Sequence, residues 1–283
     1  MSGKIGKIEK KPIVALIYDF DGTLAPGNMQ EYSFIKSIGL SKEEFWGKTQ
    51  VMAQIQDADP ILIYMLLMLN EAQKNGIELS RDSFRKFGKD ITFFKGVENW
   101  FDRINKIGER EGVIVEHYIN SSGLLEILEG TSIAKEFKAI FASCYYYSKK
   151  GNAVWPASAV NYTNKTQFLF KINKGILNIQ DSEKTNESIP EQDKRIAFAN
   201  MIYFGDGETD VPCMKLIKQL GGTSIGVYNP AIPRKKTIAQ KLIQANRVNF
   251  VCPADYSPRK KAEQIVRNII KRIKAEDALS KFK

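Results

Sequence analysis

Short apolar runs alternate with helical patterns along this chain. The runs are rich in Ile, Val, Tyr and Phe and are too short for typical helices. They span residues 13–18, 113–120, 139–143, 201–204, 223–228 and 248–251. Apolar residues at helical spacing fill most of the segments between them. This alternation predicts an α/β protein with a mainly parallel sheet whose central strands are buried on both faces.

Two carboxylates follow the first apolar run directly. Asp19 and Asp21 come after residues 13–18 and precede Gly22. In open α/β sheets, ligands bind outside the carboxyl ends of the strands. Two aspartates there can hold a divalent cation and can divide nucleophilic and acid/base work between them. On this stretch alone, the alternative is an Asp-Gly turn with solvated carboxylates.

Two further polar positions stand at element boundaries. The second run ends in Ser121-Ser122-Gly123, ahead of a helical stretch from Leu124. A hydroxyl there, with N–H groups of the helix's first turn, suits phosphate oxygens. The alternative is a serine that only caps the helix. Lys165 lies at the start of another helical pattern, where a positive charge is unfavourable. Local sequence therefore favours a solvated surface lysine at that position.

Carboxylates gather again after residues 201–204. The segment Gly205-Asp206-Gly207-Glu208-Thr209-Asp210 follows that run. A calcium loop of the EF-hand type would need glycine where Val211 stands, so that pattern fails. The glycine-rich stretches also match neither a P-loop nor a dinucleotide-binding fingerprint. A second acidic cluster at the same edge of the sheet is the remaining prediction.

Residues 25–94 have a helical character that interrupts the alternation. Ser41 and Glu44 form a capping-box pattern, Asp59 precedes Pro60 at a second helix start, and Ser80 begins a third helix. An insertion directly after Asp21 would cover a site at the strand end, as a lid does. An ordinary helical subdomain without a gating role is the alternative.

The predicted organisation is therefore a discontinuous core with one insertion. The core comprises residues 1–24 and 95–283, and the helical cap comprises residues 25–94. Gly27 and Gly96 lie near the two connections and are candidate hinges, because glycine tolerates wide changes of backbone angle.

The net charge of +10 is concentrated at the two ends of the sequence. Residues 1–11 carry net +3 and residues 257–283 carry net +6, so the body between them is nearly neutral. A nucleic-acid groove normally puts such an excess on a folded face, so no nucleic-acid partner is expected. Apolar spacing over 262–274 predicts a docked helix with a solvated basic face, and binding to an anionic surface is the alternative.

The remaining composition narrows the chemistry and the compartment. The three cysteines, Cys144, Cys213 and Cys252, are widely spaced, which argues against a disulfide framework or a zinc site. His117 lies inside the second run and is expected to be a hydrogen-bonded structural residue. The longest apolar run, 61–69, is far too short to span a bilayer. We expect a cytoplasmic protein with no membrane insertion and leave its oligomeric state open.

These residues resemble the four motifs of the haloacid dehalogenase (HAD) superfamily, in order. The motifs correspond to 19–23, Ser121, Lys165 and 205–210, and the likeness extends to about residue 215. The cap after the first motif resembles that of phosphoserine phosphatase-like members, which often have Ser-Gly-Gly where this chain has Ser121-Ser122-Gly123. The resemblance implies a Rossmann-like core with the site at the strand ends.

The resemblance also implies roles for individual residues. Asp19 would be the nucleophile that forms an aspartyl-phosphate, and Asp21 would be the general acid and base. Ser121 and Lys165 would hold phosphoryl oxygens. Thr23, Ser122 and Gly123 would complete the phosphate site.

A magnesium ion is the implied cofactor. Asp19, the backbone carbonyl of Asp21, and Asp206 would hold Mg²⁺, with Asp210 acting through water. Glu31 is a candidate contact from the cap to the substrate.

The predicted function is a Mg²⁺-dependent phosphatase that acts on a small phosphorylated metabolite. A catalytically idle HAD-fold protein that binds a phosphorylated ligand or a protein partner is the alternative. The sequence does not identify the substrate.

Overall fold

The computed structural model describes residues 11–282, which contain one seven-stranded sheet in the order β4-β3-β2-β1-β5-β6-β7. All neighbouring strands pair in parallel except β3 and β4, which form an antiparallel hairpin. The strands are β1 (Ile13–Tyr18), β2 (Ile114–Leu124), β3 (Ala139–Tyr147), β4 (Ala153–Ser158), β5 (Met201–Gly205), β6 (Thr223–Tyr228) and β7 (Phe250–Pro253). The predicted α/β class with a mainly parallel sheet is confirmed.

Eleven α-helices accompany the sheet in the described residues. Four of them, α1 to α4, lie between β1 and β2 in the chain and form the predicted helical insertion. The helices are α1 (Phe34–Ser37), α2 (Lys42–Gln56), α3 (Pro60–Lys74), α4 (Arg81–Gly88), α5 (Trp100–Glu111), α6 (Leu125–Glu129), α7 (Lys165–Lys174), α8 (Ser182–Asn186), α9 (Val211–Gln219), α10 (Pro233–Gln244) and α11 (Lys261–Ser280).

Alternate side chains of β1 enter two separate hydrophobic clusters, one on each face of the sheet. Val14, Leu16 and Tyr18 belong to the cluster that includes α5 and α11, whereas Ala15 and Ile17 pack with α7, α9 and α10. This division follows from the two-residue repeat of a strand. The central strand is therefore buried on both sides, which is why it carries an unbroken apolar run.

The carboxyl ends of the three central strands lie side by side. Tyr18 at the end of β1 pairs with Ile119 of β2 and with Phe204 of β5. The N–H of Asp19 then donates to the Phe204 carbonyl at 2.9 Å. Residues that follow β1, β2 and β5 consequently meet at one edge of the sheet.

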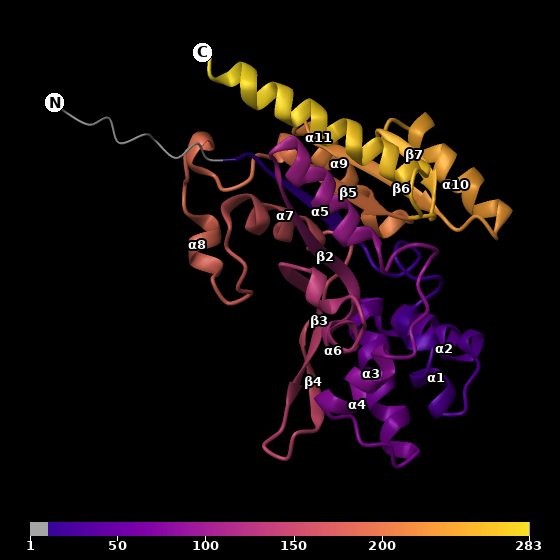
Figure 1. The fold of residues 1–283 in the computed structure, drawn as a ribbon. Coiled ribbons are helices and arrows are strands. Elements are labelled where there is room, and N and C mark those ends of the chain that lie inside the picture. The colour runs from indigo at the N-terminus through magenta and orange to yellow at the C-terminus, as the bar shows by residue number, and fades with distance from the viewer. Residues whose placement is uncertain (1–10, 283) are drawn as a thin grey trace.

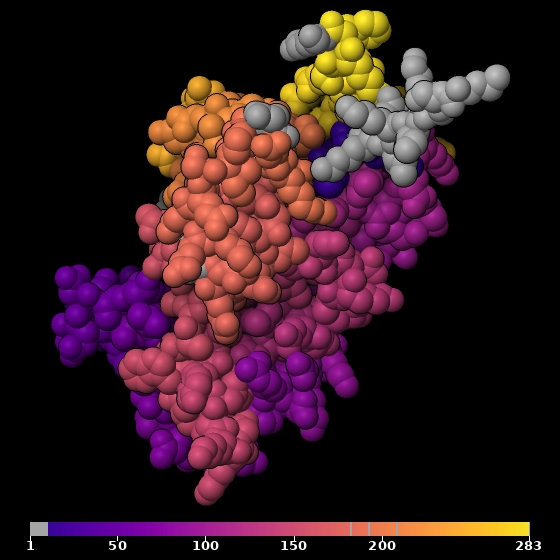
Figure 2. Space-filling view, turned by 90° about the vertical axis from the view of Figure 1, so that its left-hand side faces the viewer, coloured from indigo at the N-terminus to yellow at the C-terminus, as the bar shows by residue number. Residues whose placement is uncertain are grey.

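The insertion begins its helices where the sequence predicts. Ser41 and Glu44 form the capping box of α2, and the Asp59 carboxylate caps α3 by accepting the N–H of Ile61 at 2.7 Å. Figure 1 shows these helices at the lower right, beside the long β3–β4 hairpin. In Figure 2 the hairpin projects at the bottom, below the segment that contains α7 and α8.

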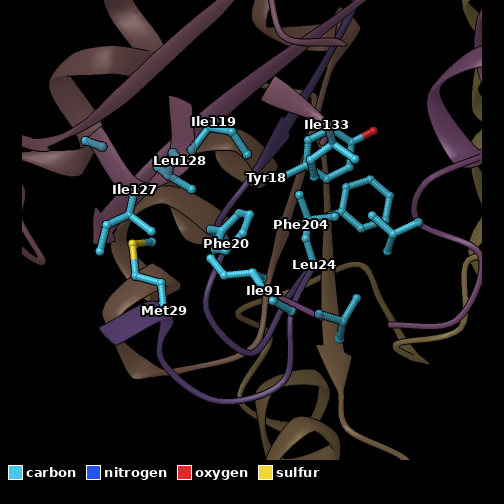
Figure 3. Packing of buried hydrophobic residues seen from close by; sticks show 14 of the residues in the cluster. Tyr18, Phe20, Leu24, Met29, Ile91, Ile119, Ile127, Leu128, Ile133 and Phe204 are labelled. Carbon is cyan, nitrogen blue, oxygen red and sulfur yellow. The ribbon is translucent and has the colours of Figure 1, made fainter. Parts of the chain in front are cut away.

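One hydrophobic cluster joins the insertion to the core. Phe20, Leu24 and Met29 lead from β1 into the insertion, and they share the cluster with Ile91 and Ile127 (Figure 3). The same cluster reaches α2, α3 and α4. The division at residues 24 and 95 remains a prediction, since the apolar packing runs across it.

Several boundaries differ from the sequence analysis. Helix α5 begins at Trp100 and does not include Gly96, because Gly96 has a backbone φ of +84° that is incompatible with a helix. Strand β2 continues through Ser121-Ser122-Gly123 to Leu124, and β3 extends to Tyr147. The polar segment 178–195 contains the short helix α8.

The basic C-terminal region forms the helix that its pattern predicts. Val266, Ile269, Ile270 and Ile273 are buried against the core, and α11 packs on α5. The first basic region, residues 1–11, lies almost entirely outside the described residues. None of the described helices is long and apolar enough to cross a membrane.

His117 is buried and hydrogen-bonded, as expected for a structural histidine. Its Nδ1 is 3.0 Å from the Tyr18 hydroxyl, and its Nε2 is 3.0 Å from Asn105 Oδ1. Burial lowers the pKa of His117 from its ordinary value to about 3. The ring is therefore neutral in the folded protein at neutral and mildly acidic pH.

We predict that His117 remains neutral at pH 5 and that this makes the fold acid-sensitive. Its pKa is about 3 in the folded chain and about 6.5 in the unfolded chain. Between these values the unfolded state binds more protons, so stability falls as pH decreases. Nitrogen NMR of the single imidazole should show a neutral ring at pH 5, and titration near pH 6.5 would contradict this. Relative to His117→Gln, the wild type should lose up to about 1.4 kcal/mol of unfolding free energy per pH unit below 6.5.

Candidate active site

Three carboxylates converge at the carboxyl edge of the sheet. Asp19 follows β1, and Asp206 and Asp210 follow β5. One carboxylate oxygen from each lies within 4.8 Å of the others. Asp19 and Asp210 are buried, and Asp206 is half-buried. The two acidic segments that lie nearly two hundred residues apart in sequence thus form one cluster, as their positions after parallel strands predict.

Lys165 lies inside this cluster. Its side chain has no solvent exposure, and its Nζ donates to Asp19 Oδ1 and to Asp210 Oδ1, each at 2.8 Å. The local alternative of a solvated surface lysine is therefore wrong. Although Lys165 opens helix α7, where the helix dipole disfavours a cation, the two carboxylates stabilise it there.

The charges in the cluster perturb one another. Burial, and then the charge of Asp210, raise the pKa of Asp19 to about 7, although Lys165 acts in the opposite direction. Burial lowers the pKa of Lys165, but Asp19 and Asp210 outweigh it and hold that pKa above its ordinary value. Burial also raises the pKa of Asp206, against the effect of Lys235. The cluster contains three carboxylates, and two ammonium groups, those of Lys165 and Lys235, contact them.

Asp21 lies beside the cluster but faces a different environment. Its Oδ1 accepts the N–H of Met29 at 2.9 Å. Burial and then the charge of Asp19 raise the pKa of Asp21 well above its ordinary value. Directly after Asp21 the chain turns at Gly22, whose φ is +76°. This turn passes so close to the second acidic segment that a Cβ at position 22 would lie 2.3 Å from Asp206 Oδ2. Only glycine fits this close approach.

The hydroxyl residues complete the edge of the site. Ser121 is buried, and its Oγ accepts the N–H of Gly123 at 3.0 Å. Ser122 has a buried Oγ without a hydrogen-bond partner. The Thr23 hydroxyl donates to Asp19 Oδ2 at 3.4 Å. Helix α6 has Leu124 as its N-cap residue with no side-chain cap, so Ser121 is not simply a capping serine.

A pocket of about 520 Å³ opens over these residues. Asp19, Asp21, Ser121, Ser122, Gly123 and Asp206 line it. Side chains from the insertion and from the loops after β4 and β6 line it as well, and the Tyr64 hydroxyl of the insertion donates to the Ser122 carbonyl at 2.8 Å. Residues of three of the four predicted segments therefore line one cavity, while the buried Lys165 does not line it and joins the site through its contacts with Asp19 and Asp210.

Sequence reasoning missed several residues of this site. Lys235 on α10 donates to Asp206 Oδ2 at 3.0 Å, and Tyr203 on β5 donates to Asp210 Oδ1 at 2.8 Å. One available signal was the basic run 234–236, which follows β6 and so belongs to the same edge of the sheet. The aromatic side chains Trp46 and Tyr64 also line the pocket, but their helical spacing indicated only a packed face.

The residues present fit a hard divalent cation. The donor set consists of carboxylate oxygens, which Mg²⁺ prefers. Asp210 Oδ2 is buried and has no hydrogen-bond partner, so it is an acceptor that lacks a positive group. The three carboxylates also outnumber the ammonium groups of Lys165 and Lys235, so the cluster lacks a positive charge. A cation among Asp19, Asp206 and Asp210 would satisfy both conditions.

Comparison with known proteins finds one curated relative over nearly the whole chain. No family model matches the sequence. A protein of Borreliella burgdorferi described as uncharacterized is 28% identical over 276 residues, which cover 88% of this chain and 93% of the relative. This relative carries no information about activity.

Solved structures share the fold at low sequence identity. A HAD family hydrolase from Salmonella enterica is 17% identical with a TM-score of 0.51, covering 80% of this chain and 66% of its own. A phospho-aspartyl intermediate analogue of phosphoserine phosphatase is 16% identical with a TM-score of 0.51, and the match covers 92% of this chain and 99% of that chain. These likenesses show that the chain has the HAD fold with a cap.

We predict that Mg²⁺ binds to this carboxylate cluster and that its affinity depends on Asp206 more strongly than on Asp210. Asp210 Oδ1 already accepts from Lys165 and Tyr203, whereas Asp206 is expected to be a direct ligand. Calorimetric titration of Mg²⁺ into Asp206→Asn and Asp210→Asn should show affinity losses of about 10–100-fold, larger for Asp206. The exposed Asp102 on α5 provides the control, Asp102→Asn, which should bind like wild type. The reverse order of losses would refute this division of roles.

Proposed function

We propose that this chain, which has the fold of the HAD superfamily, is a Mg²⁺-dependent phosphomonoesterase for a small phosphorylated metabolite. The observation that carries the proposal is the different setting of the two aspartates after β1. Asp19 is ion-paired with buried Lys165, whereas Asp21 lies outside the carboxylate cluster and has a pKa raised well above its ordinary value. Groups of the same type in such different environments can take opposite roles in proton and group transfer.

Asp19 is the proposed nucleophile. Its carboxylate is held at the pocket by Lys165 and by the Thr23 hydroxyl, so its orientation is fixed before substrate arrives. Attack of a carboxylate oxygen on phosphorus would form an aspartyl-phosphate and break the bond to the leaving alcohol oxygen. Water would then cleave the acyl phosphate and regenerate Asp19.

Asp21 is the proposed general acid and base. Burial and the charge of Asp19 raise its pKa, which favours the protonated carboxyl group that can give its proton to the leaving oxygen. The resulting carboxylate can then take a proton from the attacking water. A leaving alcohol needs this proton, whereas a halide does not, so Asp21 favours phosphate chemistry over dehalogenation.

The phosphoryl oxygens require positive and hydrogen-bonding groups. Lys165 is adjacent to Asp19, and the buried Ser122 hydroxyl has no protein partner. Ser121, Ser122 and the N–H of Gly123 are the proposed donors at the end of β2, together with Thr23. When bound among Asp19, Asp206 and Asp210, a divalent cation would neutralise part of the charge and polarise the phosphoryl group.

The insertion over residues 25–94 is proposed to select the substrate. Trp46, Ile61 and Tyr64 from this segment line the same pocket as Asp19. Such a wall excludes water and contacts the part of the substrate beyond the phosphate. Gly27 and Gly96 both have positive φ angles and remain the proposed hinge positions. A small phosphorylated metabolite fits this cavity better than a folded phosphoprotein.

We predict that Asp19→Asn loses phosphatase activity by at least about 1,000-fold, because an amide cannot act as the nucleophile. Release of nitrophenol from 4-nitrophenyl phosphate with Mg²⁺ measures the rate, and EDTA should stop the wild-type reaction. Asp102→Asn is the matched control and should keep the wild-type rate.

A catalytically idle protein is the competing hypothesis. It would show no phosphate release from any substrate while still binding a phosphorylated ligand. If the Asp19→Asn variant instead kept the wild-type rate, another residue or a contaminant would carry the activity.

A further inference from the structure

A reciprocal pair of asparagines precedes Lys165 in the turn that opens helix α7. Asn161 Oδ1 accepts the N–H of Asn164 at 3.2 Å, and Asn164 Oδ1 accepts the N–H of Asn161 at 2.7 Å. The Asn164 amide nitrogen also donates to the Ala159 carbonyl at 2.7 Å. The N–H of Lys165 then donates to the Asn161 carbonyl at 3.1 Å. Asn161 therefore organises the turn from which Lys165 enters the site.

The Asn161 side chain also contacts the insertion. Its Nδ2 donates to Asp59 Oδ2 at 2.6 Å, although 102 positions separate the two residues in sequence. Because Asn161 Oδ1 is already used within the turn, the amide nitrogen is the group that faces Asp59. Asp59 Oδ1 accepts the N–H of Ile61 at the start of α3. Each of the two side chains thus uses one atom to cap its own helix and the other to join the two helices.

Helix α3 is itself fixed on the core, so Asp59 has a defined position. The Tyr64 hydroxyl donates to the Ser122 carbonyl at 2.8 Å, and the Tyr145 hydroxyl of β3 donates to the Met65 carbonyl at 2.8 Å. Tyr64, Met65 and Tyr145 are buried. A shift of α3 would therefore break its contacts with β2 and β3, and it would carry Asp59 away from α7.

The backbone of Lys165 is held on two sides by hydrogen bonds. The buried Asn120 amide donates to the Lys165 carbonyl at 3.1 Å, while the Asn161 turn holds its N–H. The side chain places Nζ 2.8 Å from Asp19 Oδ1. A displacement of this first turn moves the ammonium group relative to the proposed nucleophile. A misplacement of about 1 Å in such a group can cost about 100-fold in rate.

We propose that Asp59 is a positioning residue that acts on Lys165 through Asn161. Its hydrogen bond fixes the first turn of α7 from the side of the insertion, so Lys165 is correctly placed only while α3 remains in contact with the core. The inference rests on the proposed phosphatase function, in which Lys165 holds phosphoryl oxygens. The insertion thereby contributes to the reaction as well as to the choice of substrate.

An exchange of the two side chains tests the proposal. Asp59→Asn places two amide donors against each other, and Asn161→Asp places two carboxylates against each other, so each single change breaks the hydrogen bond. Both replacements keep the oxygen that caps the helix, and asparagine and aspartate are equally good caps. The double variant Asp59→Asn/Asn161→Asp restores the hydrogen bond with donor and acceptor exchanged, and it leaves the net charge of the pair unchanged.

We expect kcat/KM for 4-nitrophenyl phosphate to fall about 10-fold in each single variant and to return to within about 3-fold of wild type in the double variant. Asp57→Asn is the matched control and should keep the wild-type rate. Asp57 is exposed two residues before Asp59, in a left-handed conformation that asparagine also adopts. Full activity in the single variants, or no recovery in the double variant, would overturn the proposal.

The reactivity of individual lysines measures the placement of Lys165 without requiring turnover. Acetic anhydride modifies accessible amines, and mass spectrometry gives the rate at each position. Lys165 has no solvent exposure. Its rate should rise about 3-fold or more in each single variant, because the turn opens more often, and it should recover in the double variant. Lys171, which is buried further along α7, is the internal control and should not change.

The two measurements distinguish failure of this inference from failure of the proposed function. If wild type hydrolyses no phosphate ester but Lys165 alone becomes more reactive in the single variants, the phosphatase function fails and the inference stands. If 4-nitrophenyl phosphate is hydrolysed but Lys165 and Lys171 gain reactivity together, α7 has loosened as a whole, and the inference fails. Unchanged reactivity of Lys165 in both single variants would also refute it.

Discussion

The ammonium group of Lys165, buried between two carboxylates, is the interaction on which the site depends. Its Nζ lies 2.8 Å from Asp19 Oδ1 and 2.8 Å from Asp210 Oδ1, so it offsets the repulsion between two buried carboxylates. Removing one partner of a buried ion pair typically costs about 3–5 kcal/mol, because the remaining charge has no compensation. Lys165 thus fixes the positions of groups from β1, α7 and the segment after β5. Asp210 Oδ2 still has no hydrogen-bond partner, and the three carboxylates face only the two ammonium groups of Lys165 and Lys235, which is the electrostatic basis for a divalent cation.

The parallel sheet places the site residues next to one another, so the segments that carry them need no long loops. The ends of β1, β2 and β5 are in register, so residues that immediately follow them become neighbours without long loops. Gly22 lets the first of these turns pass against the Asp206 carboxylate. Because the insertion leaves the chain directly after this turn, its helices stand over the strand ends. The fold therefore places residues of the strand ends and residues of the insertion around one cavity.

Local signals explain which features the sequence predicted. The buried strands, the capping boxes and the acidic segments at strand ends depend on neighbouring residues only, and the structure has each of them. Lys165 is the instructive failure, since its local setting favoured solvent and its burial depends on partners from two distant segments. Trp46 and Lys235 were missed for the same reason. Their helical surroundings indicate a packed or solvated face, and only the tertiary arrangement turns them toward the cavity.

The hydrophobic cluster that runs from β1 through Phe20, Leu24 and Met29 into the insertion has a consequence for folding and evolution. Two parts that share one apolar interior melt in a single cooperative transition, because neither can expose its half of the cluster cheaply. The catalytic and recognition segments thus differ in their roles but unfold together. A lineage that exchanged this insertion for another would have to rebuild the packing around Phe20 and Leu24 at the same time. Substitutions that change ligand preference are therefore expected to accumulate on the cavity walls, while the joining cluster resists change.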